Sequence, residues 1–185
     1  MVFSSLHFIF IFMPIFFGCY YIVPDKIKNF ILFIGSLCFY FVGTIHNPEH
    51  FILFILSIVA DFAIGIWIEK FPARKKILLA IGVILHLISL AVFKYSGFVI
   101  NEMSRLNPSF NFTADVVLPI GISFYTFQGI SYIVDVYRGN AKAERSLLRY
   151  AVYISMFEQL IAGPIVTYGQ VEKELYKRKI KVSSV

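Results

Sequence analysis

Long apolar runs, separated by short polar or charged segments, dominate the pattern of this chain. A helix needs roughly 17–25 mostly apolar residues to cross a bilayer. Five runs meet that requirement, over Phe3–Val23, Ile27–Ile45, Phe51–Ile68, Ile77–Ile100 and Val116–Tyr137. The pattern therefore predicts an all-α, polytopic membrane protein with about five transmembrane helices.

A sixth apolar run, Leu147–Ala162, is shorter than the usual spanning length. Gly163-Pro164 follows it directly, and proline cannot continue a helix without losing a hydrogen bond and clashing. Irregular backbone at membrane depth is tolerated where protein buries it or a water-filled cavity adjoins it. We therefore expect a re-entrant or interfacial helix here, within a transmembrane unit over residues 1–168. A charged tail over residues 169–185 follows it.

Composition supports the lipid bilayer as the main partner and argues against nucleic acid. The chain of 185 residues is 58% hydrophobic and only 15% charged, whereas soluble domains average about 45–50% apolar and about 25% charged residues. Its net charge of +6 comes from Lys and Arg that cluster between the apolar runs. That distribution is the positive-inside pattern of membrane proteins, not the basic face of a nucleic-acid-binding domain.

The charged loops also predict an orientation. Loops after the first, third and fifth runs are basic, as in Arg74-Lys75-Lys76, whereas loops after the second and fourth runs carry acidic residues such as Glu49 and Glu102. Basic loops stay in the cytoplasm. We therefore expect a multi-pass protein of the cell membrane with an extracytoplasmic N-terminus.

Polar residues in the fifth run form one helical face. Tyr125, Gln128, Tyr132 and Asp135 recur at alternating spacings of three and four, which places them on the same side of a helix. A polar stripe on a membrane helix faces inward, because polar groups in hydrocarbon are costly. It either hydrogen-bonds to packed helices or lines a cavity, and the pattern leaves both alternatives open.

Asp61 is the sharpest single position, because it is an ionisable group near the middle of the third run. An isolated Asp there costs at least about 2.5 kcal/mol, so its carboxylate must pair or be solvated. A buried hydrogen-bond acceptor is favoured over a proton-relay role, since no second membrane carboxylate faces it. His86 is assigned to packing, because the sequence shows neither a nucleophile nor an orienting partner beside it.

Cys19 and Cys38 both lie inside apolar runs. No CxxC pair and no Cys/His spacing typical of a metal site accompanies them. We expect them to pack as small hydrophobic residues. The sequence therefore predicts no metal site and no bound cofactor.

The sixth run ends in the string FEQLIAGPIVTY, in which Gln159 lies one turn before Gly163 and Pro164. Half-helix ends in membranes often border substrate or ion sites. The same pattern also fits a simple helix stop at the membrane interface. Both interpretations remain open for these three residues.

Six strings follow one another along the chain: MVFSSLHFIFIFMPIFFGCYY, SLCFYFVG, LSIVADFAIG, AVFKYSGF, LPIGISFYTFQGISYIVDVYRG and FEQLIAGPIVTY. In this order they resemble the membrane-bound O-acyltransferase family. The resemblance is to the bacterial branch with the alginate O-acetyltransferase membrane component and the D-alanyl transfer protein of teichoic acid synthesis. The last two strings are the most specific. One departure is visible, since Glu158 stands where the family usually shows proline.

The resemblance implies transfer of an acyl group, of acetyl or D-alanyl type, from a cytoplasmic thioester donor such as acyl-CoA or an acyl carrier protein. The acceptor is a hydroxyl of an extracytoplasmic polysaccharide or a relay partner protein. The family keeps its key histidine in the C-terminal half, and none of the four histidines of this chain corresponds to it. The resemblance therefore assigns no catalytic residue here. It places the Leu118–Arg138 helix and the Gln159–Pro164 turn in the wall of a central tunnel.

We therefore expect the chain to be the N-terminal portion of such an enzyme, ended by a frameshift, a stop codon or a contig end. Without the C-terminal half of the domain we expect it to be inactive. A non-enzymatic membrane scaffold or a small transporter is the alternative. That alternative is motivated by Asp61 and by the polar stripe of the fifth run.

Overall fold

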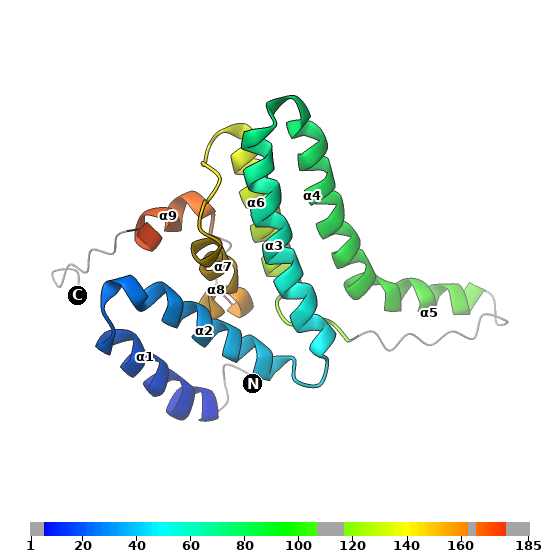
Figure 1. The fold of residues 1–185 in the computed structure, drawn as a ribbon. Helices are drawn as coiled ribbons and strands as arrows, with labels where there is room; N and C mark the ends of the chain where they lie inside the picture. The colour runs from blue at the N-terminus through cyan, green and yellow to red at the C-terminus, as the bar shows by residue number, and fades with distance from the viewer. Residues whose placement is uncertain (1–5, 107–116, 163–165, 177–185) are drawn as a thin grey trace.

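The computed structural model describes residues 6–106, 117–162 and 166–176, and every regular element in these ranges is helical (Figure 1). This confirms the all-α class. In chain order the elements are η1 (Phe8–Phe12), α1 (Met13–Ile22), α2 (Asp25–Gly43), α3 (Pro48–Lys70), η2 (Pro72–Arg74), α4 (Lys75–Leu90), η3 (Ala91–Tyr95), α5 (Ser96–Leu106), α6 (Ile122–Arg138), α7 (Leu147–Ser155), α8 (Phe157–Ala162) and α9 (Tyr168–Tyr176).

Three helical runs in the described ranges are long and apolar enough to cross a membrane: Asp25–Gly43, Pro48–Lys70 and Pro72–Ile100. They correspond to the second, third and fourth predicted spans. The first predicted span forms a shorter apolar helix, Phe8–Ile22. The fifth forms α6, which starts later than predicted because Gly121 takes a left-handed conformation, with φ of 70°, directly before it.

Helices α3, α4 and α6 lie side by side and form the centre of the fold (Figure 1). Glycines allow this close approach, because small residues let helix backbones come near one another. A Cβ atom on Gly65 of α3 would lie 2.6 Å from the hydroxyl of Tyr132 on α6. A Cβ on Gly82 of α4 would lie 2.8 Å from Cδ1 of Ile133.

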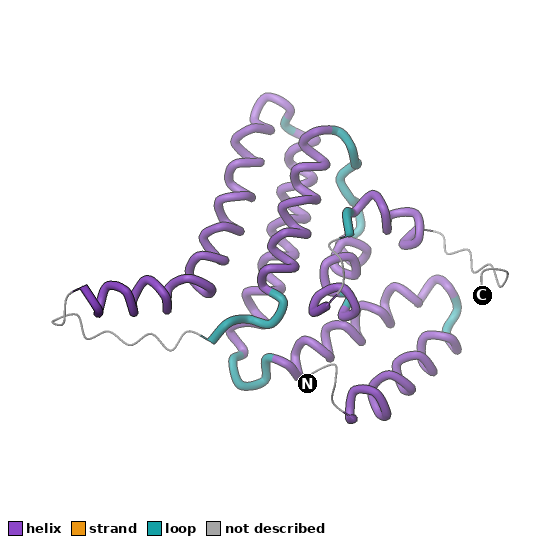
Figure 2. Tube along the Cα trace, turned by 180° about the vertical axis from the view of Figure 1, so that it is seen from behind, coloured by secondary structure: helices purple, strands orange, loops and turns teal. Residues whose placement is uncertain are grey.

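The fourth predicted span is not one straight helix. The π-helical segment η3 joins α4 to α5, and α5 leaves at a steep angle to α4 (Figures 1 and 2). A π-segment widens the hydrogen-bonding pattern of a helix and is a recognised cause of kinks. The bend carries α5 away from the central helices.

The sixth apolar run forms two helices where one was predicted. The helix breaks at Met156, where φ is −51° and ψ is 110°, and α8 begins at the next residue. The expectation of one helix continuing to Gly163-Pro164 was therefore wrong, and those two residues lie outside the described ranges. Phe157 explains the break, because its ring packs in a buried aromatic cluster with Phe8, Phe16 and Phe39.

Candidate functional site

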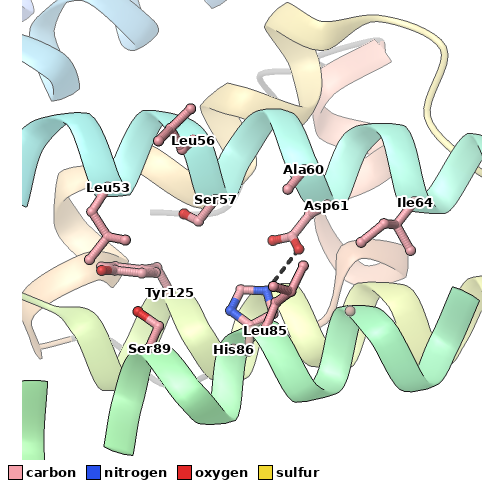
Figure 3. A pocket seen from close by; sticks show the side chains of 11 residues that line it. Leu53, Leu56, Ser57, Ala60, Asp61, Ile64, Leu85, His86, Ser89 and Tyr125 are labelled. Atoms are coloured by element: carbon pink, nitrogen blue, oxygen red, sulfur yellow. Dashed lines mark hydrogen bonds and ion pairs between the residues drawn. The ribbon is translucent and has the colours of Figure 1, made fainter. Parts of the chain in front are cut away.

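A buried polar triad joins the central helices to α7. The carboxylate of Asp61 on α3 is 3% exposed, and its Oδ1 lies 2.7 Å from Nε2 of His86 on α4 (Figure 3). The Tyr150 hydroxyl of α7 donates to Asp61 Oδ2 at 3.2 Å. Asp61 thus accepts two hydrogen bonds inside the helix bundle, so its desolvation is compensated.

The interpretation of His86 as a residue without an orienting partner was wrong, because Asp61 is that partner. A signal for the pair was present in the sequence. Asp61 and His86 lie equally far along the chain from the turn at Ala73-Arg74. Two antiparallel helices joined by a short loop bring such positions to the same depth in a membrane.

The third central helix meets the Asp61–His86 pair at Gly129. A Cβ atom on this residue of α6 would overlap Asp61 Oδ2 and would lie 2.6 Å from His86 Nε2. Only a residue without a side chain fits there while the pair keeps its geometry. Gly129 therefore belongs to the same arrangement, although its position did not draw attention in the sequence.

A cavity of about 170 Å³ lies between α3 and α4 and reaches α6 (Figure 3). Aliphatic side chains such as Leu53, Ile64 and Leu85 make most of its wall. Its polar lining residues are Ser57, Asp61, His86, Ser89 and Tyr125. The cavity thus combines an apolar wall with a few convergent polar groups, which is the usual character of a small-molecule site.

The polar stripe predicted in the fifth run lies on α6, mostly on the face that is buried in the fold. Tyr125, Gln128 and Tyr132 are buried, and Asp135 is half-buried. Gln128 donates to Gln159 Oε1 at 3.3 Å, so two of the predicted site residues meet. The Tyr132 hydroxyl accepts the backbone N–H of Glu144 at 3.0 Å. Of the four stripe residues, Tyr125 lines the cavity described above.

The remaining predicted position with described geometry, Asp135, has separate surroundings. The side chain of Asp135 is 3.5 Å from Nδ2 of Asn140, at the C-terminal end of α6. Gly163 and Pro164 lie outside the described residues. The structure therefore brings Gln128 and Gln159 together and keeps Asp135 apart from them.

Sequence reasoning missed a second buried carboxylate, Glu144, in the loop between α6 and α7. Its side chain is 1% exposed and accepts hydrogen bonds from several groups. Arg149 binds both of its oxygens, at 2.8 and 3.1 Å, and Tyr168 of α9 donates its hydroxyl. The remaining donors are the backbone N–H groups of Arg145 and Ser146 and the Tyr176 hydroxyl.

Opposing effects act on the pKa of Glu144. Burial alone would raise it, but the hydrogen bonds from Arg149, Tyr168 and the Ser146 backbone outweigh burial and hold the pKa below its ordinary value of 4.5. The carboxylate is therefore ionised at neutral pH. Charged loop residues are usually solvated, so no sequence pattern distinguished Glu144 from an ordinary surface residue.

Among residues 6–106, 117–162 and 166–176, no group of three or more His, Cys, Asp or Glu side chains could hold a metal ion. Asp61 and His86 supply only two such groups. Tyr150, the third member of the triad, donates to Asp61 instead of facing a common centre.

The fold describes a helical membrane protein with buried polar groups in its interior. Comparison with curated proteins makes this specific. The chain is 37% identical over 175 residues to a probable alginate O-acetylase of Pseudomonas aeruginosa, covering 91% of this chain and 33% of that protein. It is 39% identical to a probable alginate O-acetylase of Azotobacter vinelandii, with 91% and 34% covered.

A third relative is the peptidoglycan O-acetyltransferase of Helicobacter pylori, 29% identical over 92% of this chain and 38% of that protein. The chain is thus homologous to the N-terminal portion of membrane-bound O-acyltransferases, as its sequence strings indicated. It spans about a third of the length of the curated relatives it matches. No protein-family model matches the chain. No solved structure matches it either.

Proposed function

We propose that this chain forms the N-terminal part of the transmembrane domain of an O-acyltransferase. The observation that carries the proposal is 37% identity to an alginate O-acetylase across 91% of the chain. In this proposal α1 and α6 also cross the membrane, which gives five spans, and α7 with α8 forms the re-entrant segment. The second class of relative, a peptidoglycan O-acetyltransferase, favours acetyl as the group transferred.

The proposed reaction moves the acyl group from a cytoplasmic thioester, carried by coenzyme A or an acyl carrier protein, to a polysaccharide hydroxyl outside the membrane. An extracytoplasmic protein could relay the group. General-base help by a histidine contributes about 10²–10⁴-fold to such steps, and the family resemblance assigns that histidine to the C-terminal half of the domain. The proposed role of this chain is therefore to line the cavity in which transfer occurs and to hold its shape.

Buried polar residues support this role. Gln128 of α6 and Gln159 of α8 meet inside the fold, at the two strings that carry the family resemblance most specifically. Polar side chains of this kind within membrane helices are costly unless they pack together or line a pathway. Their arrangement fits a chain that forms one side of an enclosed reaction site.

A chimera tests the proposal. The N-terminal third of the Pseudomonas aeruginosa alginate O-acetylase is replaced by this chain, and the chimera is expressed in a strain that lacks its own O-acetylase. We expect the secreted alginate to regain acetyl groups, measured by NMR of the purified polymer. The intact relative is the positive control, and the relative without its N-terminal third is the negative control.

The contrary result is a chimera that reaches the membrane in the same amount as the intact relative but leaves alginate at the acetyl content of the negative control. A second chimera guards against a poor fit between the halves. In it, residues of the relative replace only those side chains of this chain that contact the remainder of the domain. If both chimeras insert and neither acetylates, the enzyme proposal fails in favour of a scaffold or transporter.

A further inference from the structure

The cavity between α3 and α4 has features of a ligand site. It is open to the outside of the bundle, and the rim residues Leu56 and Leu85 are 59% and 52% exposed. Both helices belong to runs long and apolar enough to cross a membrane. The opening of the cavity is therefore apolar, and the apolar part of a ligand suits it.

The inner end of the cavity carries polar groups with unused hydrogen-bonding capacity. Tyr125 is 1% exposed, and within the described residues its hydroxyl has no hydrogen-bond partner. Figure 3 shows Tyr125 between Leu53 and Ser89, at the same cavity as the Asp61–His86 pair. A buried hydroxyl without a partner costs about 1–3 kcal/mol, so it points to a missing ligand or water.

The Asp61–His86 pair fixes the other polar group. His86 Nε2 and Asp61 Oδ1 share one hydrogen bond across their 2.7 Å contact, which leaves the other ring nitrogen, Nδ1, outside this pair. A hydroxyl can serve Nδ1 in either role, because a hydroxyl donates to a lone pair and accepts from an N–H. Figure 3 shows this second nitrogen pointing away from Asp61, toward the side where Ser89 lies. Tyr150 donates to Asp61 and Gly129 leaves room for the pair, so the position of Nδ1 is preorganised.

We propose that this cavity binds the hydroxyl end of a membrane-borne alcohol, that is, an amphiphile whose alkyl chain extends into the bilayer past Leu56 and Leu85. A hydroxyl both donates and accepts, which matches an imidazole nitrogen, the unpartnered hydroxyl of Tyr125 and the nearby hydroxyl of Ser89. A volume of about 170 Å³ suits one small end group, since an engineered cavity of about 150 Å³ binds benzene. The rest of the ligand remains outside. This binding is independent of the proposed acyl transfer.

The test is photolabelling of the 185-residue chain in phosphatidylcholine nanodiscs. The probe is octan-1-ol with a diazirine on its alkyl chain, and the matched control probe is the corresponding alkane without the hydroxyl. Mass spectrometry locates the adducts. We expect the alcohol to label cavity residues of α3 and α4 about fivefold to tenfold more than the alkane does, which is the effect of about one buried hydrogen bond. Excess unlabelled octan-1-ol should abolish this labelling.

Two variants separate recognition of the hydroxyl from occupation of an apolar hollow. Tyr125→Phe removes only the unpartnered hydroxyl, and it should reduce alcohol labelling about fivefold while leaving alkane labelling unchanged. Ala60→Leu should fill the cavity and suppress labelling by both probes, because Ala60 lines it. Ala91→Leu, on the exposed surface of η3, is the matched control and should change neither.

Equal labelling by alcohol and alkane overturns the proposal, and so does full alcohol labelling of Tyr125→Phe. Adducts spread evenly over the exposed helix faces would also overturn it, since they show partitioning into lipid only. If Ala60→Leu is misfolded by circular dichroism and gel filtration, competition by unlabelled octan-1-ol in the unmodified chain decides in its place.

Discussion

Asp61 stabilises the bundle by accepting two hydrogen bonds while it is only 3% exposed. Removing it leaves the His86 ring nitrogen and the Tyr150 hydroxyl buried without their partner, which costs about 1–3 kcal/mol for each, or about 2–5 kcal/mol together. We therefore expect Asp61→Ala to lower the free energy of unfolding by that amount, measured by reversible unfolding in mixed detergent micelles. Asp135→Ala is the matched control and should cost at most about 1 kcal/mol, because Asp135 is only half-buried. Equal effects of the two variants would contradict the role given to Asp61.

The absence of a Cβ atom at Gly129 also contributes to stability. Gly129→Ala would push a methyl group into Asp61 Oδ2 and His86 Nε2, and overpacking of this kind typically costs about 1–3 kcal/mol. Gly18→Ala offers a comparison within another helix, because a Cβ there meets nothing within 4 Å. That change should be neutral or stabilising by up to about 1 kcal/mol, since alanine favours helix over glycine. Melting curves of both variants in the same detergent measure this difference in stability. A loss of stability in Gly18→Ala but not in Gly129→Ala would contradict the prediction.

At the scale of elements, Glu144 fastens α9 and the loop between α6 and α7 to the bundle. Its side chain binds Arg149 of α7 and Tyr168 of α9. The nearby Glu69 at the end of α3 adds an ion pair to Arg145 and accepts the Ala143 N–H at 2.5 Å. One loop therefore joins four helices through two carboxylates.

This arrangement predicts a dependence of stability on pH. The pKa of Glu144 is lowered in the folded state, so its contribution is complete above the ordinary value of 4.5 and is lost as pH falls through the lower folded-state pKa. Glu144→Gln should cost about 1.5–3 kcal/mol at pH 7, because it removes hydrogen bonds to a charged group. Unfolding measured from pH 7 to pH 3 should show the two proteins converging in acid. A difference in unfolding free energy between the two proteins that grows as pH falls would contradict this prediction.

The long helices could be predicted from sequence, whereas their interruptions could not. Apolar runs predicted α2 and α3 closely, because lipid requires such length and composition. The bend at η3 and the break at Met156 carry neither proline nor glycine at the break itself, so no local signal marks them. The Asp61–His86 pair depends on how α3 and α4 are rotated about their axes, which composition does not reveal. Glu144 was missed because its partners come from two other helices.

For the whole molecule, the basic loops predict an orientation in the membrane. The loop after α3 and the loop after α6 meet through Glu69 and Arg145, so they must lie on the same side. We expect cysteines introduced at Lys75 and Asn140 to react with a membrane-impermeant maleimide only from the cytoplasm. A cysteine at His46 should react only from outside. Cys19 and Cys38 are replaced by serine beforehand, because both are exposed. Labelling of all three positions from one side would refute this topology.

The close contact of Gly129 with Asp61 and His86 has a consequence for how such proteins diverge. A larger residue at position 129 cannot coexist with this pair in its present geometry. Lineages that acquire a side chain there must also have changed Asp61 or His86, and lineages that keep both must keep the glycine. Positions 61, 86 and 129 should therefore covary among homologues, although Asp61 and His86 are 25 residues apart along the chain. The need for glycine at position 129 thus restricts the substitutions that homologues can accept at this contact.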